Sequence, residues 1–143
     1  MASADVYDAI RGHLETSWTA TPIVFENEPY DPDPASHWIM VEMAGTYYGR
    51  ESIGTGDAMA DRYDEAGTVM ISCMAPANGG ARVARAHLKT VADLFRGTEL
   101  MAGRLTFMDA QVGFGENIAA TGQGSTGNWY RLEMNVEWRV TEA

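Results

Sequence analysis

The segment Tyr130–Val140 alternates apolar and polar residues more strictly than any other part of the chain. Charged residues and one asparagine occupy every second position. The apolar positions between them are Tyr130, Leu132, Met134, Val136, Trp138 and Val140. A repeat of two residues is typical of a β-strand, because successive side chains point to opposite faces of the sheet. The segment therefore predicts an antiparallel strand with one buried face and one face in water.

Four other segments have the composition of strands. They are Ile23–Phe25, His37–Met43, Thr68–Met74 and Arg104–Glu116. Each is rich in β-branched, aromatic or other apolar residues and is bounded by turn residues. His37–Met43 is apolar at most positions, so we expect it to be covered on both faces. Gly113 and Gly115 indicate a bulge in the last segment.

Two segments have the period of an amphipathic helix. In Ala4–Trp18, an apolar residue recurs every four positions, at Val6, Ile10, Leu14 and Trp18. A second helix is predicted to begin after Asn78, Gly79 and Gly80 and to end at Gly97. Its stripe consists of Val83, Ala84, His87, Leu88, Val91, Leu94 and Phe95. Both stripes are typical of helices that pack on a sheet.

The order of these elements predicts a single α+β domain over residues 1–143. We expect a mainly antiparallel sheet of about four to six strands, with the two helices packed on one face. The chain has 143 residues, of which 45% are apolar and 21% are charged. These values suit one folded domain that encloses one core.

Residues 44–67 interrupt the pattern with several glycines, mixed charges and three tyrosines. Segments of this length without secondary structure are uncommon in compact domains, and most are functional or flexible. We predict a long loop or a hairpin here. Tyr47, Tyr48 and Tyr63 suit a protein interface, and they suit equally well a cover for the chain's own sheet.

Three prolines between Glu28 and Ser36 predict an extended surface loop, because proline cannot donate to a strand ladder. Tyr30 lies in this loop. Its ring suits either a contact surface or packing against the sheet.

Ten basic and twenty acidic residues give the chain a net charge of -10. This charge disfavours binding to nucleic acid and allows a surface past which DNA slides without adhering. Residues 1–5 lack the features of a signal peptide, and no apolar run approaches the roughly 18 residues that span a bilayer. We therefore expect neither export by such a signal nor a place in a membrane. Cys73 is the only cysteine, which excludes a disulfide within the chain.

The sequence contains no recognisable catalytic arrangement. His13, His37 and His87 are far apart along the chain, and Cys73 has no basic neighbour that would activate a thiol. A satisfied histidine on a helix face and a buried core cysteine are the favoured interpretations. We predict that the protein is not an enzyme. A small enzyme or ligand-binding domain that uses His87 or the acidic loop is the less favoured alternative.

No cofactor or metal site is predicted either. The acidic group Asp57, Asp61, Asp64 and Glu65 lacks the residue order of a calcium loop, so we expect it to face water, with a structural cation as the alternative. The glycines at 122, 124 and 127 have the spacing of a dinucleotide-binding turn. That turn must open a helix, whereas a strand is predicted to follow here.

Several stretches resemble the tail terminator, or tail completion, family of long-tailed phages and gene transfer agents. An N-terminal helix ends in Leu14 and Trp18, and the turn EPYDPDP precedes the strand HWIMVEM. The strand VMISCMAP then leads directly into NGGARVARAHLKTVADLFRG, a passage from strand to helix that is common in that family. The resemblance covers most of the chain.

The resemblance implies a structural virion protein, assembled in the host cytoplasm and located at the head–tail junction. Such a protein forms a homohexameric ring on the tail tube protein, ends tube polymerisation and joins the tail to a head-side connector, and DNA passes through its lumen without specific binding. A head-completion subunit or a tail tube subunit is the alternative. No contact position carries over residue by residue. Composition alone therefore predicts the subunit or tube interface, at Tyr30, Tyr47, Tyr48, Arg50 and Tyr63.

Overall fold

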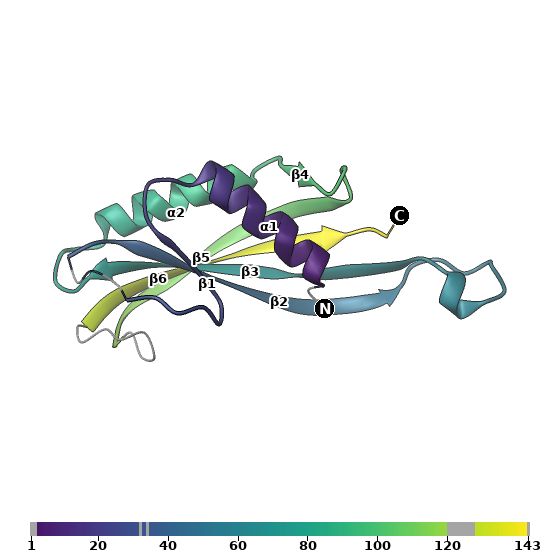
Figure 1. The fold of residues 1–143 in the computed structure, drawn as a ribbon, viewed down its shortest axis with the longest axis horizontal. Coiled ribbons are helices and arrows are strands. Elements are labelled where there is room, and N and C mark those ends of the chain that lie inside the picture. Colours follow the sequence, from purple (N-terminus) through teal and green to yellow (C-terminus); the bar gives the residue numbers. More distant parts are fainter. Residues whose placement is uncertain (1–2, 32, 34, 120–127, 143) are drawn as a thin grey trace.

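Two helices lie over one face of a curled sheet, and a long hairpin extends from that sheet (Figure 1). The structure, a computed structural model, describes residues 3–31, 33, 35–119 and 128–142. In chain order the elements are α1 (Ala4–Ser17), β1 (Ile23–Phe25), β2 (Trp38–Arg50), a short 3-10 helix η1 (Ala58–Ala60), β3 (Tyr63–Pro76), α2 (Arg82–Phe95), β4 (Glu99–Leu100), β5 (Leu105–Ala119) and β6 (Asn128–Val140).

The strands form one sheet in the order β1-β2-β3-β6-β5-β4. The predicted α+β class is confirmed, but the sheet is mixed and not the mainly antiparallel one expected. Strand β1 runs parallel to β2, with Ile23 opposite Ile39, whereas the other neighbouring strands pair antiparallel. Parallel neighbours need a connection of about a dozen residues. The segment between Phe25 and Trp38 provides it by carrying the chain back to the end of the sheet where β1 begins.

The core lies between the helices and the sheet. Helix α1 buries Val6, Ile10 and Leu14, and α2 buries Ala84, Leu88, Val91 and Phe95. The apolar face predicted for β6 is confirmed, since Leu132, Met134, Val136 and Trp138 are buried under the helices. Val83 is a correction to the predicted stripe of α2, because its side chain is 47% exposed. Neither helix in the described part of the chain is long and apolar enough to cross a membrane.

A second, smaller cluster covers the opposite face at one end of the sheet. It consists of Val24, Trp38, Met74 and Trp129, and Tyr30 and Met40 pack against it. The Trp38 ring meets the Trp129 ring edge-on, with 5.9 Å between centroids. The start of β2 is therefore covered on both faces, as its apolar composition predicted.

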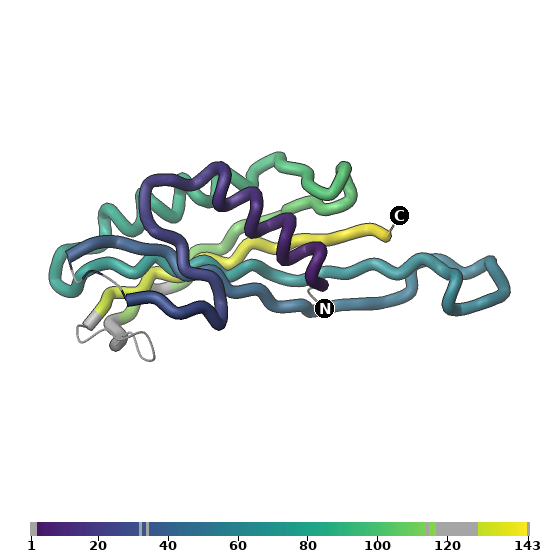
Figure 2. The backbone as a smooth tube through the Cα atoms, viewed as in Figure 1, coloured from purple at the N-terminus to yellow at the C-terminus, as the bar shows by residue number. Residues whose placement is uncertain are grey.

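Residues 44–67 form a hairpin, named here the arm. Strands β2 and β3 continue through it as a pair, from Ala44 opposite Thr68 to Arg50 opposite Tyr63, with a register shift between Gly45 and Tyr47. Figure 2 shows the arm extending away from the helices. The predicted strands His37–Met43 and Thr68–Met74 were too short, because beyond the helices no apolar face is required and only backbone pairing continues.

Gly67 is the point at which the arm leaves the core. It is buried, and a Cβ atom at this position would overlap the carbonyl oxygen of Ala44 and the ring of Trp138. The Trp138 ring is fully buried. At the base of the arm, the indole ring of Trp138 therefore packs directly against the backbone of Gly67.

Gly67→Ala should lower the free energy of unfolding by about 1–3 kcal/mol, the usual cost of overfilling a packed site. The added methyl group must displace either the Ala44 backbone or the Trp138 ring. Urea denaturation followed by tryptophan fluorescence measures the change.

Gly12→Ala is the matched control, because Gly12 lies in α1 with nothing within 4 Å of the position of a Cβ atom. It should raise the free energy of unfolding by up to roughly 1 kcal/mol, since alanine favours the helix. Equal effects of the two substitutions would contradict the close packing at Gly67.

Candidate functional site

The arm brings together four of the five residues that the sequence predicted for an interface. Tyr47, Tyr48 and Arg50 lie on β2, and Tyr63 lies opposite Arg50 on β3. Tyr30 lies apart from them. Its ring packs on Trp38 at the covered end of the sheet, with 5.3 Å between centroids. The structure thus places one aromatic group on the arm and one tyrosine in the second cluster.

Tyr48 and Tyr63 occupy the face of the arm that turns toward α1. Their rings stack at 5.6 Å between centroids with an angle of 24°. They border a hollow of about 280 Å³ that Ser3, Glu65 and Arg104 also line. The backbone N–H of Ser3 donates to Glu65 Oε1 at 3.0 Å. The start of α1 is therefore attached to the arm beside this aromatic pair.

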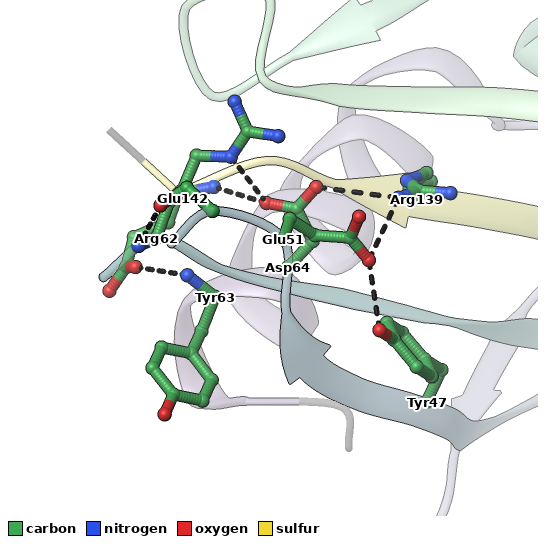
Figure 3. A network of polar contacts seen from close by, with 8 residues as sticks. Tyr47, Glu51, Arg62, Tyr63, Asp64, Arg139 and Glu142 are labelled. Carbon is green, nitrogen blue, oxygen red and sulfur yellow. Dashed lines mark hydrogen bonds and ion pairs between the residues drawn. The ribbon is translucent and has the colours of Figure 1, made fainter. Parts of the chain in front are cut away.

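The other face of the arm carries a polar network (Figure 3). The Tyr47 hydroxyl donates to Glu51 Oε1 at 2.9 Å, and Arg139 lies 3.3 Å from the same oxygen. Arg139 also lies 3.4 Å from Asp64 Oδ2. The network joins the arm to the end of β6.

Asp64 is the centre of this network, with only 1% of its surface exposed. Arg62 lies 3.3 Å from its Oδ1, and the backbone N–H of Glu142 donates to the same oxygen at 3.3 Å. The Glu142 carboxylate in turn accepts from the backbone N–H of Tyr63 at 2.6 Å. A buried carboxylate is tolerated only when it is paired and hydrogen-bonded, and two cations and an amide provide that here.

The tip of the arm is organised by two further carboxylates. Asp61 is 6% exposed and accepts from the Thr55 hydroxyl at 2.8 Å, with Arg50 at 3.5 Å. Asp57 accepts from the backbone N–H of Met59 at 3.0 Å at the start of η1. The expectation that this acidic group faces water is therefore wrong for Asp61 and Asp64. Among the described residues, no group of three or more His, Cys, Asp and Glu side chains could hold a metal ion.

The tip also exposes two large apolar side chains that the sequence interpretation missed. Ile53 is 81% exposed and Met59 is 89% exposed. Both stand alone in a polar, glycine-rich segment, and that contrast was the available signal. Large apolar groups held outward by an ordered loop suit a contact with another surface.

The structure brings His37 and His87 together, although they are far apart in the sequence. The centroids of their rings lie 5.6 Å apart, and the centroid of the Trp18 ring lies 5.5 Å from that of His87. Burial, and next the charge of His37, lower the pKa of His87. His13 contacts the Leu94 carbonyl oxygen at 2.8 Å and joins the two helices. Cys73 is fully buried, and burial raises its pKa to about 12. The motif at 122–127 lies outside the described residues.

Comparison with known families decides what kind of protein this fold belongs to. The model of the phage tail terminator protein family matches residues 5–138, nearly the whole chain. The chain belongs to the phage tail terminator family. The resemblance drawn from the strand-to-helix passage is thereby confirmed. Terminators are structural tail proteins and not enzymes, so the protein has a structural role in phage tail assembly and contacts other tail components.

A similar fold is found among solved structures. One solved chain shares 16% sequence identity and aligns over 96% of both chains with a TM-score of 0.55. At this identity the likeness concerns the fold alone. Comparison with curated protein sequences gave no match.

Asp64→Ala should destabilise this terminator by roughly 1–3 kcal/mol, because it removes the hydrogen bonds of a buried charged group. The substitution removes the carboxylate that pairs with Arg62 and Arg139 and accepts from the backbone N–H of Glu142, and Arg139 keeps only Glu51. Asp109→Ala, at an exposed site on β5, should change stability by less than about 0.5 kcal/mol. Chemical denaturation of both variants checks this, and equal stabilities would show that the network contributes nothing.

Stability should also fall with decreasing pH through His87. Its pKa in the folded protein lies below the ordinary value of about 6.5, so the unfolded chain binds the proton first as the pH falls. The free energy of unfolding should therefore decrease from pH 7 toward pH 5. In His87→Gln the dependence should be shallower, and an unchanged slope would contradict the assignment.

Proposed function

We propose that this terminator forms a ring that caps the tail tube, ends its polymerisation and joins the tail to the head-side connector or stopper protein. The family match over residues 5–138 carries the proposal. We further propose that the ring is a homohexamer, that the 143 residues act in it as one domain, and that it is added in the host cytoplasm and remains at the head–tail junction of the virion.

The arm supports the proposal, because a ring subunit needs surfaces that reach beyond its own core. Tyr48 is 54% exposed and Tyr47 is 43% exposed. Aromatic side chains in such positions are frequent anchors of protein interfaces. We propose that Tyr47, Tyr48, Arg50 and Tyr63 contact a neighbouring subunit or the tube, and that Tyr30 contributes at the other end of the sheet.

The charge of the chain supports a ring through which DNA moves. A net charge of -10 repels the phosphate backbone. DNA would then pass through the lumen without specific binding, which suits a conduit better than it suits a DNA-binding protein.

Removal of the gene should give tails with tubes longer than normal, because nothing ends polymerisation. Purified protein added to tubes should appear as rings at one end in negative-stain micrographs. Tail-length histograms with and without the gene are the measurement, and re-expression from a plasmid is the control. Tails of normal length without the protein would exclude a terminator, and unlimited stacking of the purified protein into tubes would identify a tube subunit.

A further inference from the structure

The sheet face beneath the helices is not fully covered, and a groove remains between α2 and β5. Its volume is about 620 Å³. Apolar side chains from both elements line it, namely Leu88, Ala92, Phe95, Phe107, Met108 and Val112. Met108 and Val112 are 51% and 53% exposed. The groove is thus an open apolar site on a surface that should otherwise be polar.

The groove stays open because the sheet has no further strand on this side over most of its length. Strand β4 pairs only with Leu105 and Thr106. Beyond Thr106, no strand among the described residues pairs with the outer edge of β5. Two register shifts, after Phe107 and after Val112, interrupt the pairing of β5 with β6 beside the groove. An uncovered edge beside an apolar groove is a site that another chain can occupy.

The α2 side of the rim is basic, although the chain as a whole is acidic. Arg85, Lys89 and Arg96 of the α2 segment border it, with Asp93 paired to Lys89 at 2.6 Å, whereas the β5 side carries Asp109. A partner that fits should therefore present apolar side chains among acidic ones.

The tip of the arm has this composition. Ile53 and Met59 point their apolar groups into solvent. Between Arg50 and Arg62 the tip has one exposed carboxylate, Asp57, because Glu51 pairs with Arg139 and Asp61 is buried beside Arg50. In Figure 2 the arm extends away from α2 at one end of the long axis, so a chain cannot place its tip in its own groove. Every copy thus carries both complementary halves of one contact.

We infer that the tip of the arm of one copy docks in the groove between α2 and β5 of the next copy. This inference rests on the proposed ring and specifies how it is held together. A contact between two different surfaces is heterologous, and it closes into a ring when the rotation between copies permits. Ile53 and Met59 enter the apolar groove, and Asp57 beside them meets the cations of the α2 segment.

Cysteine cross-linking tests the contact. The variant Met59→Cys with Val112→Cys places one thiol on the tip and one in the groove. Its matched control is Met59→Cys with Val83→Cys, because Val83 is similarly exposed on α2 but does not line the groove. The native Cys73 is buried and stays unreactive. Both variants are bound to tube ends, oxidised and separated without reductant.

The groove variant should give a series of covalent oligomers of this chain up to the full ring, whereas the control should stop at monomers and dimers. Equal patterns from the two variants would overturn the inference, as would cross-links from the groove cysteine to a tube or connector protein. If rings cap the tubes in either case, the proposed function stands. If the wild-type protein caps no tubes, the proposed function fails and this contact fails with it.

A second variant does not depend on thiol geometry. Ile53→Asp with Met59→Asp changes two side chains that make little contact with their own chain, so the fold should persist. It should lose ring formation in mass photometry and on tube ends, whereas Val83→Asp should retain it. Rings of normal abundance from the tip variant would contradict the docking.

Discussion

The packing of both helices on the apolar face of β3 and β6 is the constraint on which the rest of the structure depends. Strand β6 pairs with β3 on one side and β5 on the other, and its buried side chains meet α2. Strands β3 and β6 each have a neighbouring strand on both sides. Because the core fixes them there, β2 and β3 can continue past the helices without an apolar face of their own. The arm is a consequence of a core that lies along only part of the strands.

The core elements were predictable from the spacing of their apolar residues and from the turn residues that bound them, because both signals are local in the sequence. The alternation at Tyr130–Val140 and the stripe before Gly97 gave β6 and α2 nearly to their ends. The parallel pairing of β1 was not predictable in this way, since it depends on where a proline-bearing loop delivers the chain. Likewise, the sequence indicated that Asp61 and Asp64 lie at the surface. Their cationic partners, Arg50 and Arg139, become their neighbours only when the chain folds.

The candidate site was predictable only in part. Tyr47, Tyr48 and Tyr63 stood out because aromatic residues are conspicuous in a glycine-rich segment, and hairpin pairing explains why they meet. Tyr30 stood out as an aromatic residue in a proline-bearing loop, yet it packs on Trp38. The groove beside β5 has no signature in the sequence, because it arises from a neighbouring strand that is only two residues long. A core specified by periodicity also explains how a solved chain can share this fold at 16% identity.

The continuity of β3 gives the molecule a mechanical property. One uninterrupted strand runs from the arm into the core, and twelve of its residues are in register with β6. A pull on the arm along its axis therefore shears these pairs together, and their hydrogen bonds share the load instead of breaking one after another. A peeling force across the arm would meet only the pairs at Glu65 and Ala66 first. The subunit should therefore resist tension along the arm better than a force that peels β3 from β6.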